Sequence, residues 1–272
     1  MNPILRSCIH THSTFCDGKD APEAMVQQAL ELQFLSLGFS SHGIAPYDEA
    51  AMTAETEPLY RAEIHRLQQV YDGQLEIFLG LEHDALSPYP DFSYDYLIES
   101  VHYLLLDGAY RGVDWSPEIS RTTIDRYFGG DPLAYSKYYY EVCAAAYEKT
   151  PAQIVGHLDL LTKFCDQGGS FDETDPRYLE PAKEALAVAV ERDMLVEVNT
   201  GAIGRGYRRT PYPSPALLRH LHDLGGRVIL TSDCHNKDFL NCHYPESLEL
   251  LKVCGFDHAW VLRKTGFEAY AI

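Results

Sequence analysis

Short apolar segments alternate with longer amphipathic segments along the chain, and this alternation limits the fold more than any other sequence feature. Apolar runs rich in β-branched and aromatic residues lie at 4–9, 34–39, 75–81, 96–105, 153–157, 195–198 and 228–230. Segments with helical spacing lie between and after them, at 21–32, 58–70, 132–148, 179–191, 214–224 and 245–253. Strands that alternate with helices predict repeated βα units, and therefore an α/β fold with a parallel sheet.

One domain is the expectation for residues 1–272. The length suits a single α/β barrel of roughly 250 residues, and hydrophobic residues make up 46% of the chain, enough for a sizeable core. We find no repeat and no Pro/Gly-rich linker that would divide the chain. The longest irregular region, 106–131, is expected to leave the barrel and could form a lid.

Charge and composition exclude several kinds of partner. The net charge of −18 would repel nucleic acid, and no basic run compensates for it. The seven cysteines include no CxxC pair, so we interpret them as reduced thiols. No apolar run approaches the ~18 residues of a membrane span, and none at the start resembles a secretion signal. We therefore expect a cytoplasmic protein with no membrane or nucleic-acid partner. The sequence predicts no oligomeric state.

Metal-binding residue types gather at the carboxyl ends of the predicted strands. Six of the seven strands contribute to this set: His10, His12, His42, Glu82, His102, His157, Asp233 and His235. Parallel α/β barrels place their active sites at this end of the sheet. His10 and His12 are two residues apart, as are Asp233 and His235, so each pair faces one way and could share a metal ion. Asp17 lies on the loop over the same mouth.

A lone histidine on an apolar strand is more often a hydrogen-bonded core residue than a ligand. Several polar groups buried together without a metal would be costly, however, so the combined set predicts a cluster of divalent cations. Its nitrogen and oxygen ligands suit Zn, Mn and Fe alike. His83 is excluded because it points away from Glu82 if the strand continues. The remaining histidines are interpreted as solvent-facing: His65, His220, His222, His243 and His258.

Ordered motifs along nearly the whole chain carry a family resemblance. They are "HTHSTFCDGKD", "GFSSH", "GLEHD", "YLIESVHYLL", "GHLDLL", "EVNTGAIGRGYRRTPYPSP" and "SDCH". In this order they resemble the PHP (polymerase and histidinol phosphatase) family, and most of all its bacterial histidinol-phosphate phosphatases. The resemblance implies a single distorted (β/α)7 barrel with about three metal ions at the carboxyl ends of the strands.

The same resemblance implies how the ligands divide among the metals. His10, His12, Glu82 and Asp233 would hold the first metal. Glu82 would bridge to a second metal, completed by His102 and His157. Asp17, His42 and His235 would hold the third. Glu99 and Cys234 stand where the family pattern often has small residues.

The activity implied by the resemblance is hydrolysis of a small phosphate monoester. The substrate would be L-histidinol phosphate, cleaved to L-histidinol and phosphate in histidine biosynthesis, and the nucleophile a metal-bound hydroxide. Glu82, Asp233 and His235 would be catalytic residues. Arg205 and Arg208, on the loop after the sixth predicted strand, are candidates for binding the phosphate because a guanidinium matches its geometry.

Three alternatives remain open at this point. Another PHP-type phosphoesterase would act on a different small phosphorylated metabolite. An amidohydrolase would also begin with His-x-His and end with a metal-bound aspartate, but it would hold only one or two cations. A noncatalytic metal-binding regulatory domain would keep the ligands and show no turnover.

Overall fold

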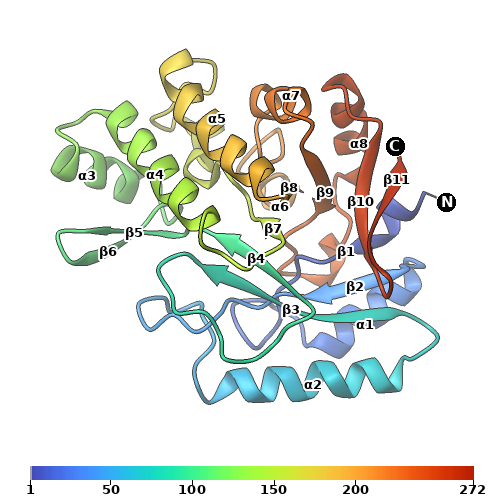
Figure 1. Cartoon of the computed structure of the whole chain (residues 1–272). Coiled ribbons are helices and arrows are strands. Elements are labelled where there is room, and N and C mark those ends of the chain that lie inside the picture. Colours follow the sequence, from blue (N-terminus) through green and yellow to red (C-terminus); the bar gives the residue numbers. More distant parts are fainter. Residues whose placement is uncertain (1) are drawn as a thin grey trace.

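A computed structural model describes residues 2–272 (Figure 1). One curled sheet contains strands in the order β1, β2, β3, β4, β7, β8, β9, β10, β11. Their bounds are β1 Ser7–Cys8, β2 Ser36–Phe39, β3 Glu76–Asp84, β4 Tyr96–Ser100, β7 Ile154–Val155, β8 Leu195–Asn199, β9 Arg227–Thr231, β10 His258–Arg263 and β11 Gly266–Ala271. Neighbouring strands are parallel except β10 and β11. The predicted α/β fold with a parallel sheet is therefore confirmed.

Helices pack on the outside of the curled sheet. Their bounds are α1 Pro22–Glu31, α2 Thr56–Val70, α3 Pro117–Tyr127, α4 Pro132–Tyr147, α5 Pro176–Glu191, α6 Gly201–Gly204, α7 Pro215–Asp223 and α8 Tyr244–Val253. In Figure 1, α1 and α2 lie below the sheet, whereas α4, α5, α7 and α8 lie above it. Each group buries apolar side chains against the strands it covers, so two separate clusters form the outer core.

A third apolar cluster fills the inner side of the sheet and includes Ile9 and Tyr96. The Tyr96 hydroxyl donates to the carbonyls of Ile9 and Phe39. Its ring fits only because Gly38 and Gly80 have no Cβ, which would lie 2.4 and 2.1 Å from Tyr96 atoms. Because Ile9 directly precedes His10, this packed layer supports the residues that follow β1.

The segments that follow β1 and β9 pair with each other at the mouth of the sheet. Thr11 and Cys234 form a parallel bridge. The His12 amide donates to the Cys234 carbonyl at 2.8 Å, and the Cys234 amide donates to the His10 carbonyl at 3.0 Å. This pairing brings the two ends of the sequence motif set into contact.

Two of the predicted strands differ from those observed. Residues 4–6 belong to a 3-10 helix, Pro3–Arg6, in which Pro3 occupies the first turn and the Asn2 side chain accepts from the Ile4 amide. The predicted strand at 96–105 breaks after Ser100. Its second half becomes β5, Tyr103–Leu106, which leaves the sheet and forms an antiparallel hairpin with β6, Ala109–Gly112.

The excursion at 106–131 is present, but it is more regular than predicted because it contains α3. In Figure 1 the hairpin and α3 extend to one side of the sheet. The final pair β10 and β11 was also not predicted. The described connection from β3 to β4, residues 85–95, contains no helix. The architecture is a mixed α/β fold with a sheet curled as in a half barrel, and the strict seven-unit repeat stays a prediction.

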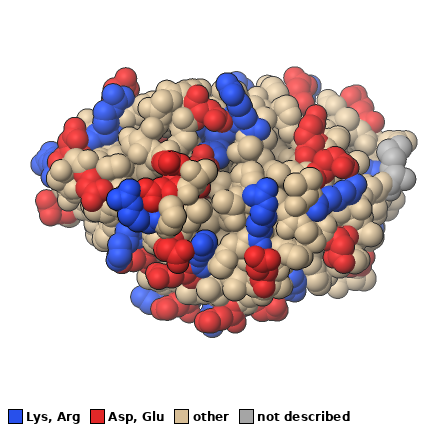
Figure 2. Space-filling model, turned by 90° about the horizontal axis from the view of Figure 1, so that it is seen from above, with Lys and Arg blue, Asp and Glu red and all other residues tan. Residues whose placement is uncertain are grey.

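Charged side chains are mixed over the face shown in Figure 2, where Lys and Arg lie among Asp and Glu. Lys137 pairs with Glu141, and Lys183 pairs with Glu180 at 2.9 Å. None of the described helices has the length and apolar character needed to cross a membrane.

Candidate metal centre

All nine predicted ligands come together at the mouth of the sheet. In each of four overlapping groups, the possible ligand atoms lie within 4.8 Å of one another. The groups are His12, Asp17, His42 and His235; His10, His12 and Asp233; His10, Glu82 and His157; and His42, Glu82 and His102. The overlap means that the cluster could hold more than one cation.

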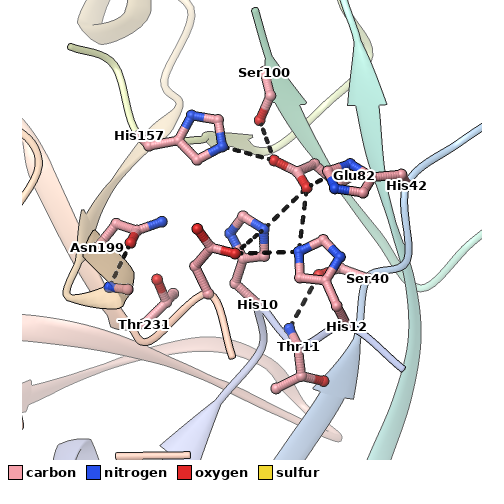
Figure 3. A network of polar contacts seen from close by, with 12 residues as sticks. His10, Thr11, His12, Ser40, His42, Glu82, Ser100, His157, Asn199 and Thr231 are labelled. Carbon is pink, nitrogen blue, oxygen red and sulfur yellow. Dashed lines mark hydrogen bonds and ion pairs between the residues drawn. The ribbon is translucent and has the colours of Figure 1, made fainter. Parts of the chain in front are cut away.

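Glu82 lies at the centre of the cluster, at the end of β3 (Figure 3). One carboxylate oxygen, Oε2, faces three ring nitrogens. It lies 3.2 Å from His10 Nε2, 3.4 Å from His12 Nε2 and 3.1 Å from His42 Nδ1.

The other Glu82 oxygen, Oε1, faces a different set of residues. It lies 2.9 Å from His157 Nε2 and 3.3 Å from His102 Nε2, and it accepts a hydrogen bond from Ser100 Oγ at 2.7 Å. Because the two oxygens face separate histidines, this carboxylate has the geometry of a bridge between two cation positions.

Several buried polar atoms in the cluster have no hydrogen-bond partner within residues 2–272. Those that face one another are His10 Nε2, His12 Nε2 and Glu82 Oε2. Polar atoms buried without a partner are destabilising, whereas bound cations would satisfy atoms of this kind. The residues therefore fit a divalent metal cluster, and their mixed nitrogen and oxygen atoms suit Zn, Mn or Fe.

Asp17 completes the outer edge of the cluster from the loop after His12. Its Oδ2 lies 3.2 Å from His235 Nε2, and its Oδ1 lies 3.7 Å from His42 Nε2. The loop is tight because Gly18 packs against it: a Cβ on Gly18 would lie 2.4 Å from the backbone nitrogen of Ser13. The glycine therefore helps to direct Asp17 toward the histidines.

Asp233 has a left-handed backbone, with φ of 45°, which is uncommon for a residue other than glycine. Its Oδ1 lies 3.2 Å from His12 Nε2 and 3.4 Å from His235 Nδ1. Its Oδ2 accepts from Arg205 at 3.0 Å, and Arg205 also lies 3.0 Å from His235 Nδ1. Arg205 thus contacts two of the predicted ligands directly.

Glu197, in the middle of β8, orients two histidines and was missed in the sequence. Its Oε1 accepts from His10 Nδ1 and Thr231 Oγ1, and its Oε2 accepts from the His157 amide at 2.8 Å and from Asn199 at 2.9 Å. A bond to Nδ1 leaves Nε2 of His10 free to face the cluster, as is usual for metal-binding histidines. Its position as an acidic residue inside an otherwise apolar strand could have identified Glu197 from the sequence.

Asp84 plays a similar part for His102 and was also missed. Its Oδ2 accepts from the His102 amide at 2.9 Å and lies 3.4 Å from His102 Nδ1. Its Oδ1 accepts from the Tyr47 hydroxyl at 2.7 Å. The spacing of two residues from Glu82 in the same strand places Asp84 on the same face, and this spacing could have identified it.

His83 points away from the cluster, as predicted. Its Nδ1 lies 3.0 Å from Glu99 Oε2, and its ring stacks on Tyr89 at 4.1 Å. Glu99 also accepts from the Thr150 hydroxyl at 2.7 Å. This buried group forms a separate network behind β3 and β4.

Charges within the cluster shift the pKa values of its side chains. Burial alone would raise the pKa of Glu82, but His10, His42 and His102 hold this pKa well below its usual value. Burial alone would lower the pKa of His10, but Glu197, Glu82 and Asp233 raise it well above the usual value. The metal-free cluster therefore retains protons on histidine, and cations must compete with those protons.

A cavity of about 580 Å³ opens beside the cluster, and both Arg205 and Lys163 line it. Lys163 forms an ion pair with Asp114 at 2.8 Å. Lys163 was not among the predicted site residues, because its loop lies outside the predicted strands. Two cationic side chains therefore face the same cavity as the predicted ligands.

Arg208 was also predicted to contact the phosphate, but the structure places its side chain away from the cavity wall. Arg208 is only 4% exposed and is not part of the cavity wall. Its guanidinium donates to the Thr162 carbonyl at 2.8 Å, to Glu173 at 2.7 Å and to Thr210 Oγ1 at 3.2 Å. It connects the loops after β7 and β8, a role that loop sequence alone does not reveal.

Comparisons with known proteins agree with this geometry. The PHP domain family model matches residues 9–201. A protein from Deinococcus radiodurans, named probable histidinol-phosphatase, is 32% identical over 90% of this chain and 92% of its own length. Both the model and the relative cover most of the chain.

Two solved structures share the fold. A crystal structure from Listeria monocytogenes has a TM-score of 0.79 at 24% identity, and the match covers 88% of this chain and 99% of that one. A histidinol phosphate phosphatase from Lactococcus lactis, solved with Zn, L-histidinol and phosphate, has a TM-score of 0.72 at 19% identity, covering 97% and 99%. Together with the model match and the Deinococcus relative, these likenesses show that the chain belongs to the PHP domain family.

Proposed function

We propose that this chain is a phosphoric monoester hydrolase that cleaves L-histidinol phosphate to L-histidinol and inorganic phosphate. The observation that carries the proposal is the bridging geometry of Glu82, whose two oxygens face separate histidines within the nine-residue cluster. The names of the relatives support the substrate, since the Deinococcus protein is named a probable histidinol-phosphatase. The reaction belongs to histidine biosynthesis.

We take the cluster to hold three divalent cations, with residues 1–272 forming one (β/α)7 domain. His10, His12, Glu82 and Asp233 would hold the first cation; Glu82, His102 and His157 the second; and Asp17, His42 and His235 the third. Such cations would generate a nucleophile from water near neutral pH and neutralise charge on the phosphoryl oxygens. Metal analysis of the purified protein would identify them as Zn, Mn or Fe.

Side chains around the cluster would position the substrate. Arg205 has a guanidinium at the cavity wall and is fixed by Asp233 and His235, so it can donate to a phosphate oxygen in a set orientation. Lys163 adds a second positive charge on the same wall. Glu82 and Asp233 would be catalytic residues that place negative charge beside the reacting phosphoryl group. His235, which lies against Asp17, would be the third catalytic residue.

A phosphate-release assay on purified, metal-analysed protein tests the proposal. L-histidinol phosphate should be the preferred substrate in a panel of small phosphate monoesters, with Zn, Mn or Fe supplied. Glu82→Gln should abolish most turnover, because an amide cannot supply negative charge between two cations. Glu99→Gln is the matched control, since it changes a buried acid that contacts none of the predicted ligands.

Two results would contradict the proposal in different ways. Absence of turnover in protein that contains its full metal complement would favour a noncatalytic metal-binding domain. Clear preference for another ester would keep the phosphatase activity and reject the substrate.

A further inference from the structure

The cavity beside the cluster is large enough for a whole small metabolite. Its volume of about 580 Å³ lies within the range of roughly 300–1,000 Å³ that is typical of small-molecule sites. Beyond the predicted metal ligands, its wall comes from the loop after β2, from β5, from α3 and the segment before it, and from the loops after β7 and β8. This outer wall is where the alcohol half of the substrate must lie.

Tyr103 offers a buried and unpartnered hydroxyl on this wall. The side chain is 2% exposed, and its hydroxyl has no hydrogen-bond partner within residues 2–272. The ring is held edge-on by Tyr47 at 5.1 Å and by Trp115 at 5.9 Å between centroids. Tyr103 directly follows His102, a predicted ligand. A fixed polar group of this kind, next to the reacting centre and without a partner, points to a ligand.

Asp48 gives the same region a negative charge. It lines the cavity, and its Oδ1 accepts from the Ala50 amide at 2.9 Å. Within the described residues it has no ion-pair partner, whereas the neighbouring Asp114 is neutralised by Lys163. Burial and the nearby Asp48 carboxylate both raise the pKa of the Tyr103 phenol, which places the two side chains close to each other.

Trp115 supplies a flat apolar surface at the cavity mouth. Its side chain is 58% exposed, although it lines the cavity. It also packs over Gly112, where a Cβ would lie 2.7 Å from the indole. An indole face of this kind can stack on a planar ring or lie against a cation.

We propose that Tyr103, Asp48 and Trp115 form the subsite for the leaving alcohol and select a phosphate ester that has a protonated amine beside a flat ring. The subsite rests on the proposed function, because the metal cluster would hold the phosphate at the opposite end. Asp48 and the Tyr103 hydroxyl receive the ammonium group, and Trp115 covers the ring. Cations held by the predicted ligands at one end and an unpaired carboxylate at the other would together match a zwitterionic substrate and disfavour anionic alcohols.

The test compares two esters that differ only in the amine. One is L-histidinol phosphate, and the other is its desamino analogue, which keeps the imidazole and lacks the ammonium group. The measured quantity is the selectivity, defined as kcat/KM for the first ester divided by kcat/KM for the second. A charge-assisted hydrogen bond to the amine should give the wild-type protein a selectivity of about tenfold or more.

Two isosteric variants should reduce this selectivity, each by about tenfold. Asp48→Asn removes the charge but keeps an oxygen for the Ala50 amide. Tyr103→Phe removes the hydroxyl but keeps the ring contacts with Tyr47 and Trp115. Glu49→Gln is the control, because it removes the same charge from an exposed neighbour that is not part of the cavity wall, and it should leave the selectivity unchanged. Metal content is measured on every preparation.

The outcomes separate this subsite from the phosphatase activity itself. If the wild-type protein turns over histidinol phosphate but both variants keep its selectivity, the subsite is wrong and the proposed function stands. Equal losses on both esters would also overturn the subsite, since the variants would then act on the metal centre or the fold. If the metal-loaded wild-type protein hydrolyses neither ester, both proposals fail.

Discussion

Replacement of Glu197 by Gln should weaken metal binding more than its small change in shape suggests. Glu197 accepts four hydrogen bonds, two on each oxygen, from His10, Thr231, His157 and Asn199. A glutamine side chain has one oxygen and one NH₂ group, so it can accept from only one of these two pairs. In either orientation, the pair of donors on the other side faces the NH₂ group of the glutamine, which cannot accept from them.

The orientation decides which donors lose their acceptor, whereas either orientation removes the negative charge that makes His10 a more basic ligand. If the amide oxygen faces His10, the His157 amide and Asn199 lose their acceptor, at a cost of about 1–3 kcal/mol for each buried donor. If the NH₂ group faces His10, the ring must move its proton from Nδ1 to Nε2, the atom that faces Glu82. We therefore expect a destabilisation of about 2–6 kcal/mol and a loss of about 10- to 100-fold in metal affinity.

Competition with a chelating dye measures the affinity, and urea unfolding measures the stability. Glu99→Gln is again the matched control, because it should cost stability without changing metal affinity. Metal affinity of the Glu197→Gln variant within threefold of wild type would refute the reasoning.

Three further predictions address the arginines and the protons. Arg205→Ala should lower kcat/KM by about 10- to 100-fold, through loss of a charge-assisted hydrogen bond, and lysine should recover only part of it. Because Arg205 also fixes Asp233, some metal loss should accompany the change. A decrease in kcat/KM of less than threefold, with the metals intact, would show that Arg205 is only a surface residue. Arg208→Met should lower the free energy of unfolding by about 2–3 kcal/mol, because Glu173 loses its partner, and should leave KM unchanged; a raised KM at normal stability would contradict this. Metal affinity should rise with pH, because in the metal-free protein carboxylates and Cys16 raise the pKa of His12 to about 10 against the effect of burial, so protonated histidine opposes binding at neutral pH. Calorimetry in buffers of different ionisation enthalpy should detect the protons released when metal binds. A metal affinity independent of pH would contradict this prediction.

The parts predicted from the sequence depend on periodicity and on strand direction. Residues that follow successive parallel strands must meet at one end of the sheet, so His10, Glu82 and Asp233 could be grouped without a structure. The same logic explains why His83 could be excluded, since side chains alternate along a strand.

The parts that were missed or wrong depend on contacts between distant segments. Glu197 stands out only once its four donors are known, and Tyr103 only once the hairpin has left the sheet. Arg208 shares a loop with Arg205 but turns toward Glu173, and nothing local distinguishes the two arginines. Residues 4–6 have β-type composition, yet Pro3 and the Asn2 side chain begin a 3-10 helix there.

Anomalous diffraction from crystals of the metal-loaded protein tests the central claim most directly. The account predicts three cation peaks at the mouth of the sheet. Two of them should lie about 2.0–2.2 Å from different oxygens of Glu82, and the third should lie among Asp17, His42 and His235. Absence of any peak in contact with Glu82, or a single cation in fully loaded protein, would contradict the proposed metal cluster and the phosphatase mechanism built on it.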